Sequence, residues 1–178
     1  MRLASTSIIA GLLCLVSAAP LSASDHDPND VVSPEAIVAA TYKSIERAPG
    51  QPYDWDRFRA LFLPEALMVP NAEQTGGTTE ILTPEGFIEW VDRVAPAGQP
   101  GDRGFAEEVV NNEIHRFGDV AQVFSTYQKR FYDDERILGR GINSFQLLFR
   151  DDRWWIVSLV WDEEVGAGPI PAEYRGEN

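Results

Sequence analysis

The chain has 178 residues, with 28 acidic side chains against 15 basic ones and a formal net charge of −13. This length suits one domain with a real hydrophobic core, and 44% hydrophobic and 24% charged residues argue against global disorder. The excess of acid disfavours nucleic acid or an anionic membrane surface as a partner, because both attract Lys and Arg. The single Cys excludes a disulfide framework and a Cys-rich metal site.

The first residues have the three-part pattern of a secretory signal peptide. Arg2 gives a positive start, residues 8–16 form a short apolar run, and small residues follow. The run is shorter than the roughly 20 residues of a bilayer span. We therefore expect residues 1–23 to be a signal peptide, cut between about Ala18 and Ser24, and the protein to be periplasmic or secreted. The alternative is a retained N-terminal anchor; after signal removal no membrane partner is expected.

Three helices are predicted after a polar, flexible lead-in at residues 24–33. Ser33-Pro34-Glu35 and Thr83-Pro84-Glu85 each combine a capping hydroxyl, a proline at the first helical position and an acid in the first turn. Asp54 can cap a helix between them, which Pro64 closes. Short strands are expected at residues 67–70 and 78–82.

From Phe105 onward the apolar pattern changes from helical spacing to alternation. Four long strands fit residues 105–117, 120–132, 137–150 and 153–163, joined by compact hairpin turns. Helices first and an antiparallel meander afterwards predict an α+β fold with the helices on one side of the sheet. The folded domain is expected over residues 34–165, followed by an acidic tail at 166–178.

Two-residue turns would fix the strand register, with Phe117 opposite Val120, Asp133 opposite Arg136, and Arg150 opposite Arg153. In this register both faces of the last two strands are largely apolar, so each face needs a cover. The helices can cover one face. We predict that a second copy covers the outer one, giving a homodimer; a monomer in sedimentation at micromolar concentration would exclude this.

The order of elements and three local motifs resemble the nuclear transport factor 2-like superfamily, and more narrowly its SnoaL-like and ketosteroid-isomerase-like branches. The motifs are Asp54-Trp55-Asp56 leading to Arg59-Ala60-Leu61-Phe62 and Pro64-Glu65-Ala66, then Phe117-Gly118-Asp119-Val120-Ala121, then Asp151-Asp152-Arg153-Trp154-Trp155-Ile156-Val157. The resemblance covers about residues 34–164. It implies a cone-shaped, curved antiparallel sheet wrapped around three N-terminal helices, with an apolar pocket inside, and it does not choose among isomerases, cyclases, dehydratases and binding modules.

The resemblance also indicates where isomerase chemistry would lie. The base of that branch falls at Pro70 or Asn71, and neither can act as a base. Its oxyanion-stabilising acid falls at Ser144, whereas its helical tyrosine has a counterpart in Tyr42. Because two of three positions differ, ketosteroid-type proton transfer is disfavoured.

By the same resemblance, one face of the sheet lines the cavity as a mostly apolar pocket with a few polar groups. The predicted ligand-pocket residues are Tyr42, Asn71, Ser125, Ser144, Gln146 and Trp161. The predicted catalytic residues are Glu163, which ends a cavity-facing strand, with Tyr127 or Arg140 as its partner. The local alternatives are a solvated strand end for Glu163 and a cross-strand salt bridge between Arg140 and Glu163.

No metal and no cofactor are expected. A metal site needs several converging His or carboxylate ligands, but His115 is the only histidine of the expected domain and His26 lies in the lead-in. No phosphate-binding loop or nucleophile motif is present. Three functions remain open: binding of a small apolar or amphipathic molecule, a cofactor-free lyase, cyclase or isomerase, and a structural role. A fully exposed Glu163 would exclude the enzyme hypothesis as stated, and a cone filled by its own side chains would favour the structural role.

Overall fold

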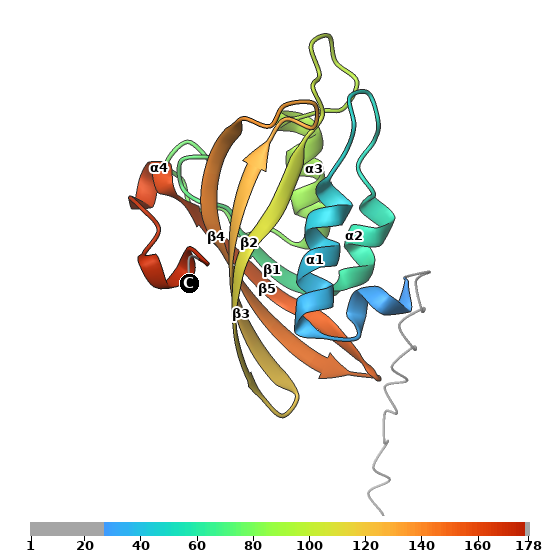
Figure 1. The fold of residues 1–178 in the computed structure, drawn as a ribbon. Coiled ribbons are helices and arrows are strands. Elements are labelled where there is room, and N and C mark those ends of the chain that lie inside the picture. The colour runs from blue at the N-terminus through green and yellow to red at the C-terminus, as the bar shows by residue number, and fades with distance from the viewer. Residues whose placement is uncertain (1–26, 177–178) are drawn as a thin grey trace, which may run out of the picture.

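The computed structural model of the chain describes residues 27–176 (Figure 1). The predicted signal peptide and its cleavage site lie outside these residues. Within residues 27–176, no helix has both the length and the apolar character that crossing a membrane requires. The later part of the predicted lead-in packs on the domain: the short helix η1 (Pro28–Val31) buries Val31, and Asp30 accepts hydrogen bonds of 2.8 and 2.7 Å from Arg57.

The three predicted helix starts are confirmed. Helix α1 (Pro34–Ile45), helix α2 (Trp55–Leu61) and helix α3 (Pro84–Val94) each begin where a side-chain oxygen accepts a hydrogen bond from a backbone N–H of the first turn. The capping residues are Ser33, Asp54 and Thr83. Helix α2 ends at Leu61, earlier than Pro64, because the next strand begins directly.

A five-stranded sheet follows the order β1-β5-β4-β3-β2. Strands β2 (Ala106–Phe117), β3 (Val120–Arg130), β4 (Ile137–Arg150) and β5 (Arg153–Glu163) form the predicted antiparallel meander. Strand β1 (Phe62–Val69) is longer than expected and pairs with β5 in parallel, so the sheet is mixed. As an edge strand it tolerates Pro64. Residues 78–82 form only an isolated bridge, between Met68 and Leu82.

The predicted register is right at two hairpins and wrong at the third. Phe117 pairs with Val120, and Arg150 pairs with Arg153, as expected. Between β3 and β4 the connection spans residues 131–136. Lys129 therefore pairs with Gly139, whereas the expected register would pair it with Arg140. Because side chains alternate along a strand, a shift of one residue moves every side chain of β4 to the opposite face.

The sheet is curved and open, and α1, α2 and α3 pack in its concave side (Figure 1). The core lies between them, where Tyr42 of α1 packs edge-on against the fully buried Phe145 of β4. At the far end of the cone, buried Arg153 donates a hydrogen bond to the carbonyl of Ala60 in the last turn of α2, where a cation is favoured. The α+β cone predicted from the sequence is confirmed as the fold.

The C-terminal segment, residues 164–176, lies on the convex face of the sheet (Figure 1). It contains helix α4 (Glu164–Ala167) and the short helix η2 (Ala172–Tyr174). Ile170 is buried, the Tyr174 ring lies 5.5 Å from that of Phe124, and Thr126 Oγ1 donates a 2.7 Å hydrogen bond to the Tyr174 carbonyl. The chain itself therefore covers part of the face that the predicted dimer would use.

Candidate functional site

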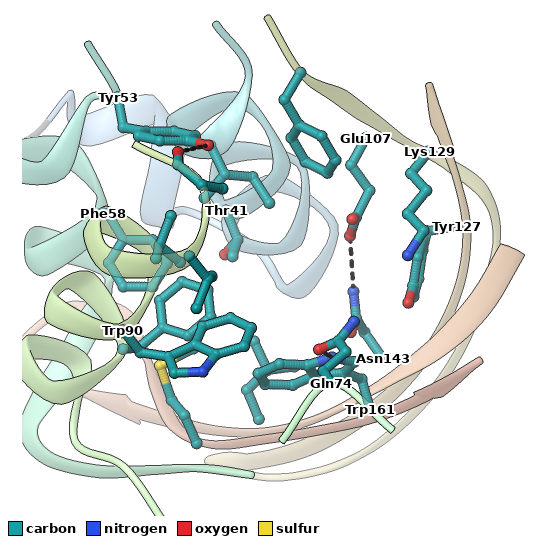
Figure 2. A pocket seen from close by; sticks show the side chains of 18 of the residues that line it. Thr41, Tyr53, Phe58, Gln74, Trp90, Glu107, Tyr127, Lys129, Asn143 and Trp161 are labelled. Atoms are coloured by element: carbon teal, nitrogen blue, oxygen red, sulfur yellow. Dashed lines mark hydrogen bonds between the residues drawn. The ribbon is translucent and has the colours of Figure 1, made fainter. Parts of the chain in front are cut away.

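A cavity of about 380 Å³ lies between the concave face of the sheet and the helices (Figure 2). One wall is aromatic, and polar side chains gather at the opposite wall. The lining residues are Thr41, Ile45, Tyr53, Trp55, Phe58, Met68, Gln74, Phe87, Trp90, Val91, Val94, Ala95, Phe105, Glu107, Tyr127, Lys129, Asn143, Leu159, Trp161 and Glu163. The cone is therefore hollow, which does not favour the structural role.

The aromatic wall is a continuous set of contacting rings centred on Phe87. Its ring centroid lies 5.8 Å from that of Trp90 and 5.8 Å from that of Trp161, the latter at a right angle. Trp55 meets Phe87 edge-on, and Tyr53 stacks on Trp55 at 4.6 Å. Such contacts hold large rings in place and give the cavity a broad, ordered apolar surface.

Glu163 anchors the polar end. It is buried, and one of its carboxylate oxygens accepts hydrogen bonds from Lys129 Nζ at 2.5 Å, Gln74 Nε2 at 2.8 Å and Tyr127 OH at 3.3 Å. A buried carboxylate is stable when it has a counter-ion and satisfied hydrogen bonds. The predicted residues Glu163 and Tyr127 thus meet in the cavity, with Lys129 as the cation, and Glu163 is not an exposed strand end.

Two glycines of the intervening strand allow this cluster to form. Lys129 and Tyr127 lie on β3 and Glu163 lies on β5, so their side chains must cross over β4. A Cβ at Gly139 would lie 2.8 Å from Lys129 Cε, and a Cβ at Gly141 would lie 2.5 Å from the Tyr127 hydroxyl. Glycine is needed at position 141, where a Cβ would meet both the Asp162 carbonyl and the Tyr127 ring, whereas at position 139 the flexible end of Lys129 would have to move.

Glu107 is among the polar site residues that the sequence prediction missed, together with Gln74, Lys129 and Asn143. An irregularity between Val109 and Asn111 shifts the β2–β3 register, so Glu107 pairs with Lys129 and its side chain faces the cavity. Its carboxyl group accepts one long hydrogen bond, 3.4 Å from Asn143 Nδ2 (Figure 2). Burial raises the pKa of Glu107 to about 8, helped by the negative charge of Glu163 and opposed by Lys129 and Asn143.

Asn143 is held from behind by two predicted pocket residues. Tyr42 OH donates a 2.8 Å hydrogen bond to Ser125 Oγ and accepts one of 2.9 Å from Asn143 Nδ2. Burial raises the pKa of Tyr42 and of Tyr127 above the usual tyrosine value, so both stay neutral. Tyr42 and Ser125 therefore orient the wall but do not line the cavity, contrary to the prediction.

Asn71 also acts indirectly. Its side-chain carbonyl accepts a 2.9 Å hydrogen bond from the backbone N–H of Gln74, which orders the loop after β1. Gln74 then reaches into the cavity and accepts a 2.9 Å hydrogen bond from Trp161 Nε1. Trp161 lines the cavity as predicted, whereas Asn71 does not.

Three predicted site residues are on the wrong side of the sheet. The one-residue shift of β4 turns Arg140, Ser144 and Gln146 to the convex face, and Asn143 takes the inward position. Arg140 is exposed and pairs in register with Gln128, so neither the catalytic role nor the salt bridge to Glu163 holds.

The loops beside the cavity are tied together by Asp102. Its carboxylate accepts hydrogen bonds from Arg47 Nη1 at 2.7 Å and from the backbone N–H groups of Gly50, Gly98 and Gly104 at 2.8 to 3.0 Å. These bonds, with Arg47 first, hold the pKa of Asp102 well below its usual range. They fix the loops that carry Tyr53, Ala95 and Phe105 into the lining.

Comparison with known proteins identifies the fold only. No family model and no curated protein matches the chain. Among solved structures it is similar to a protein with a cystatin-like fold from Nostoc punctiforme (16% identity, 64% of this chain and 78% of that one, TM-score 0.50). It is also similar to a candidate ketosteroid isomerase from Parabacteroides distasonis (11%, 73% and 86%, TM-score 0.50). An NTF2-like protein of unknown function from Silicibacter pomeroyi matches at 18% identity over 72% of this chain and 91% of that one (TM-score 0.49).

The molecule is thus an α+β cone that encloses an aromatic-walled cavity with a polar end. The chain shares the overall fold of the cystatin-like protein and of the candidate ketosteroid isomerase, in agreement with the cone predicted from the sequence. Identities this low define the architecture and leave the activity to be argued from the site.

Proposed function

We propose that the protein binds a small, largely apolar molecule in the cavity of its cone. The observation that carries this proposal is the two-sided lining, in which a wall of contacting aromatic rings faces a hydrogen-bonded polar cluster. A volume of about 380 Å³ lies within the usual range of small-molecule sites. The apolar body of the ligand would lie on the aromatic wall, and its polar group would face Glu107 and Glu163.

Titration with the uncharged dye N-phenyl-1-naphthylamine tests this proposal. We expect a saturable rise in dye fluorescence with one site per chain. Trp161→Ala removes part of the aromatic wall, so it should weaken dye binding by about tenfold. The control is Trp155→Ala, which removes the same residue type from the same strand at a position outside the lining. Absence of dye binding, or equal losses in both variants, would contradict the proposal.

A second candidate is a cofactor-free lyase, cyclase or isomerase. It is favoured by two cavity carboxyl groups in different environments: Glu163 is paired with Lys129, and Glu107 has a raised pKa and no such partner. Pairs of this kind serve as base and acid in many enzymes, and one structural neighbour is described as a candidate ketosteroid isomerase. Mass spectrometry of a bound ligand distinguishes the two functions, because a binding module releases it unchanged.

Two further proposals concern the protein's setting. We infer from the sequence pattern at residues 1–23 that the protein is exported to the periplasm or the medium; an intact N-terminus on the accumulated protein would contradict this. The convex face keeps Phe117 and Val120 exposed outside the C-terminal segment. A homodimer through that remainder of the face stays a proposal, tested by sedimentation.

A further inference from the structure

The carboxyl group of Glu107 faces the cavity and makes few interactions with other protein groups. Its one hydrogen bond, from Asn143, is long at 3.4 Å. Lys129 is its neighbour on β3, but the Lys129 ammonium is paired with Glu163. Within residues 27–176, Glu107 takes part in no ion pair of 4 Å or less. The cavity lining therefore contains two carboxyl groups and one lysine. Glu163 pairs with the lysine, whereas Glu107 faces the cavity without a cationic partner in the described part of the chain.

The opposite wall suits the apolar body of a charged ligand. Aromatic side chains offer large, ordered apolar surfaces on which a hydrocarbon group can pack. Tyr53, Trp55, Trp90 and Trp161 all line this cavity. The net charge of −13 also raises the local concentration of cations around the protein.

We propose that the cavity is selective for amines, and that the ammonium group of an aromatic or alkyl amine binds to the Glu107 carboxylate while its hydrocarbon part lies on the aromatic wall. This rests on the proposed small-molecule binding and names its ligand class. With Lys129 and Glu163 neutralising each other, an ionised Glu107 leaves one negative charge for the ligand. A carboxylate ligand would instead bring a third negative charge to the same end and is disfavoured.

The proposal predicts a specific dependence on pH. The charged and titratable groups that face Glu107 are Lys129 and Tyr127 on β3, Glu163 on β5 and Tyr42 on α1. Both tyrosines stay neutral because burial raises their pKa, and burial raises the pKa of Glu107 to about 8. Because the ammonium binds the ionised form, amine affinity should rise roughly tenfold between pH 6 and pH 7 and level off above pH 8. At pH 7 binding should release a proton.

Isothermal titration calorimetry tests the charge preference with three ligands that share a phenyl group and a two-carbon chain but differ in the charge of their polar group. The ligands are 2-phenylethylamine, 2-phenylethanol and phenylacetate, titrated in buffers of different ionisation enthalpy so that released protons are counted. We expect the amine to bind at least tenfold more tightly than the alcohol at pH 8, and phenylacetate to bind most weakly. Glu107→Gln should reduce amine binding at least tenfold and remove the preference for the amine over the alcohol. Glu108→Gln, at an exposed neighbouring position, is the control and should retain the preference.

Other outcomes would exclude either the amine class alone or small-molecule binding as a whole. Equal binding of amine and alcohol, or full amine binding by Glu107→Gln, would exclude the amine class while small-molecule binding stands. The same holds if N-phenyl-1-naphthylamine binds and none of the three ligands does. If the dye also fails to bind, the proposed function fails together with its ligand class. Retained dye binding by Glu107→Gln shows that the variant is folded.

Discussion

Glu107→Gln is expected to be more stable than the wild-type protein at pH 9 and to flatten the dependence of stability on pH. Burial raises the pKa of Glu107 in the folded protein to about 8, against 4.5 for an ordinary glutamate. Between these values the folded state holds a proton that the unfolded state has released. The free energy of unfolding must therefore fall as pH rises through this interval, and the full loss is reached above pH 8.

The size of the effect is large for one side chain. A pKa difference of this extent corresponds to at most roughly 5 kcal/mol, at about 1.4 kcal/mol per pH unit. Glu107 keeps some exposed surface toward the cavity, which reduces the expected loss to about 3 kcal/mol. A glutamine at this position is neutral at every pH, keeps the hydrogen-bonding oxygen for Asn143 and does not suffer this loss.

Urea denaturation of the wild type, Glu107→Gln and the exposed control Glu108→Gln measures this effect at pH 5, 7 and 9. We expect the wild type and Glu107→Gln to agree within about 1 kcal/mol at pH 5, and the variant to be more stable by about 2–3 kcal/mol at pH 9. The control should follow the wild type. If Glu107→Gln instead followed the wild type across the whole range, the Glu107 carboxyl would have an ordinary environment, and its place in the cavity would be wrong.

The parts of the fold set by local signals could be predicted from the sequence. Ser33, Asp54 and Thr83 start helices because a capping oxygen needs only the next three residues to act. Gly118, Asp151 and Asp152 likewise adopt the positive φ angles of tight hairpin turns. The residue pairs that flank these two turns were predicted correctly. The pair Asp134-Glu135 looked like a third such turn, but there the connection is longer.

The candidate site depended on register, which is a property of whole strands. Trp161 and Glu163 lie in the cavity lining, where they were expected, and their roles in binding and catalysis stay predictions. The side chains of β4 were placed on the opposite face because one connection was misjudged. Glu107 was missed because the irregularity at Val110 has no recognisable sequence signature. Glycines at alternate positions 139 and 141 were the available signal. They indicate that side chains from the neighbouring strands cross β4 at that point.

Lys129→Met is expected to destabilise the protein by about 2–4 kcal/mol, because it leaves the Glu163 carboxylate buried without its cation. The side chains of Lys129 and Glu163 are only 23% and 10% exposed, so water replaces little of the lost interaction. The same change should raise the pKa of Glu107 further, since the Lys129 charge now lowers it. Adding Glu163→Gln removes the stranded charge, so the double variant should recover most of the lost stability.

A double-mutant cycle at pH 7 measures this coupling from the urea denaturation of the wild type, both single variants and the double variant. We expect a coupling free energy of about 1–3 kcal/mol. Lys43→Met is the matched control, because its partner Glu46 is close but Lys43 is 63% exposed, and such a pair contributes less than about 1 kcal/mol. Additive losses, or equal costs at Lys43 and Lys129, would mean that Lys129 does not neutralise Glu163. The lysine would then be free to balance Glu107, and the charge argument for an amine ligand would fail with it.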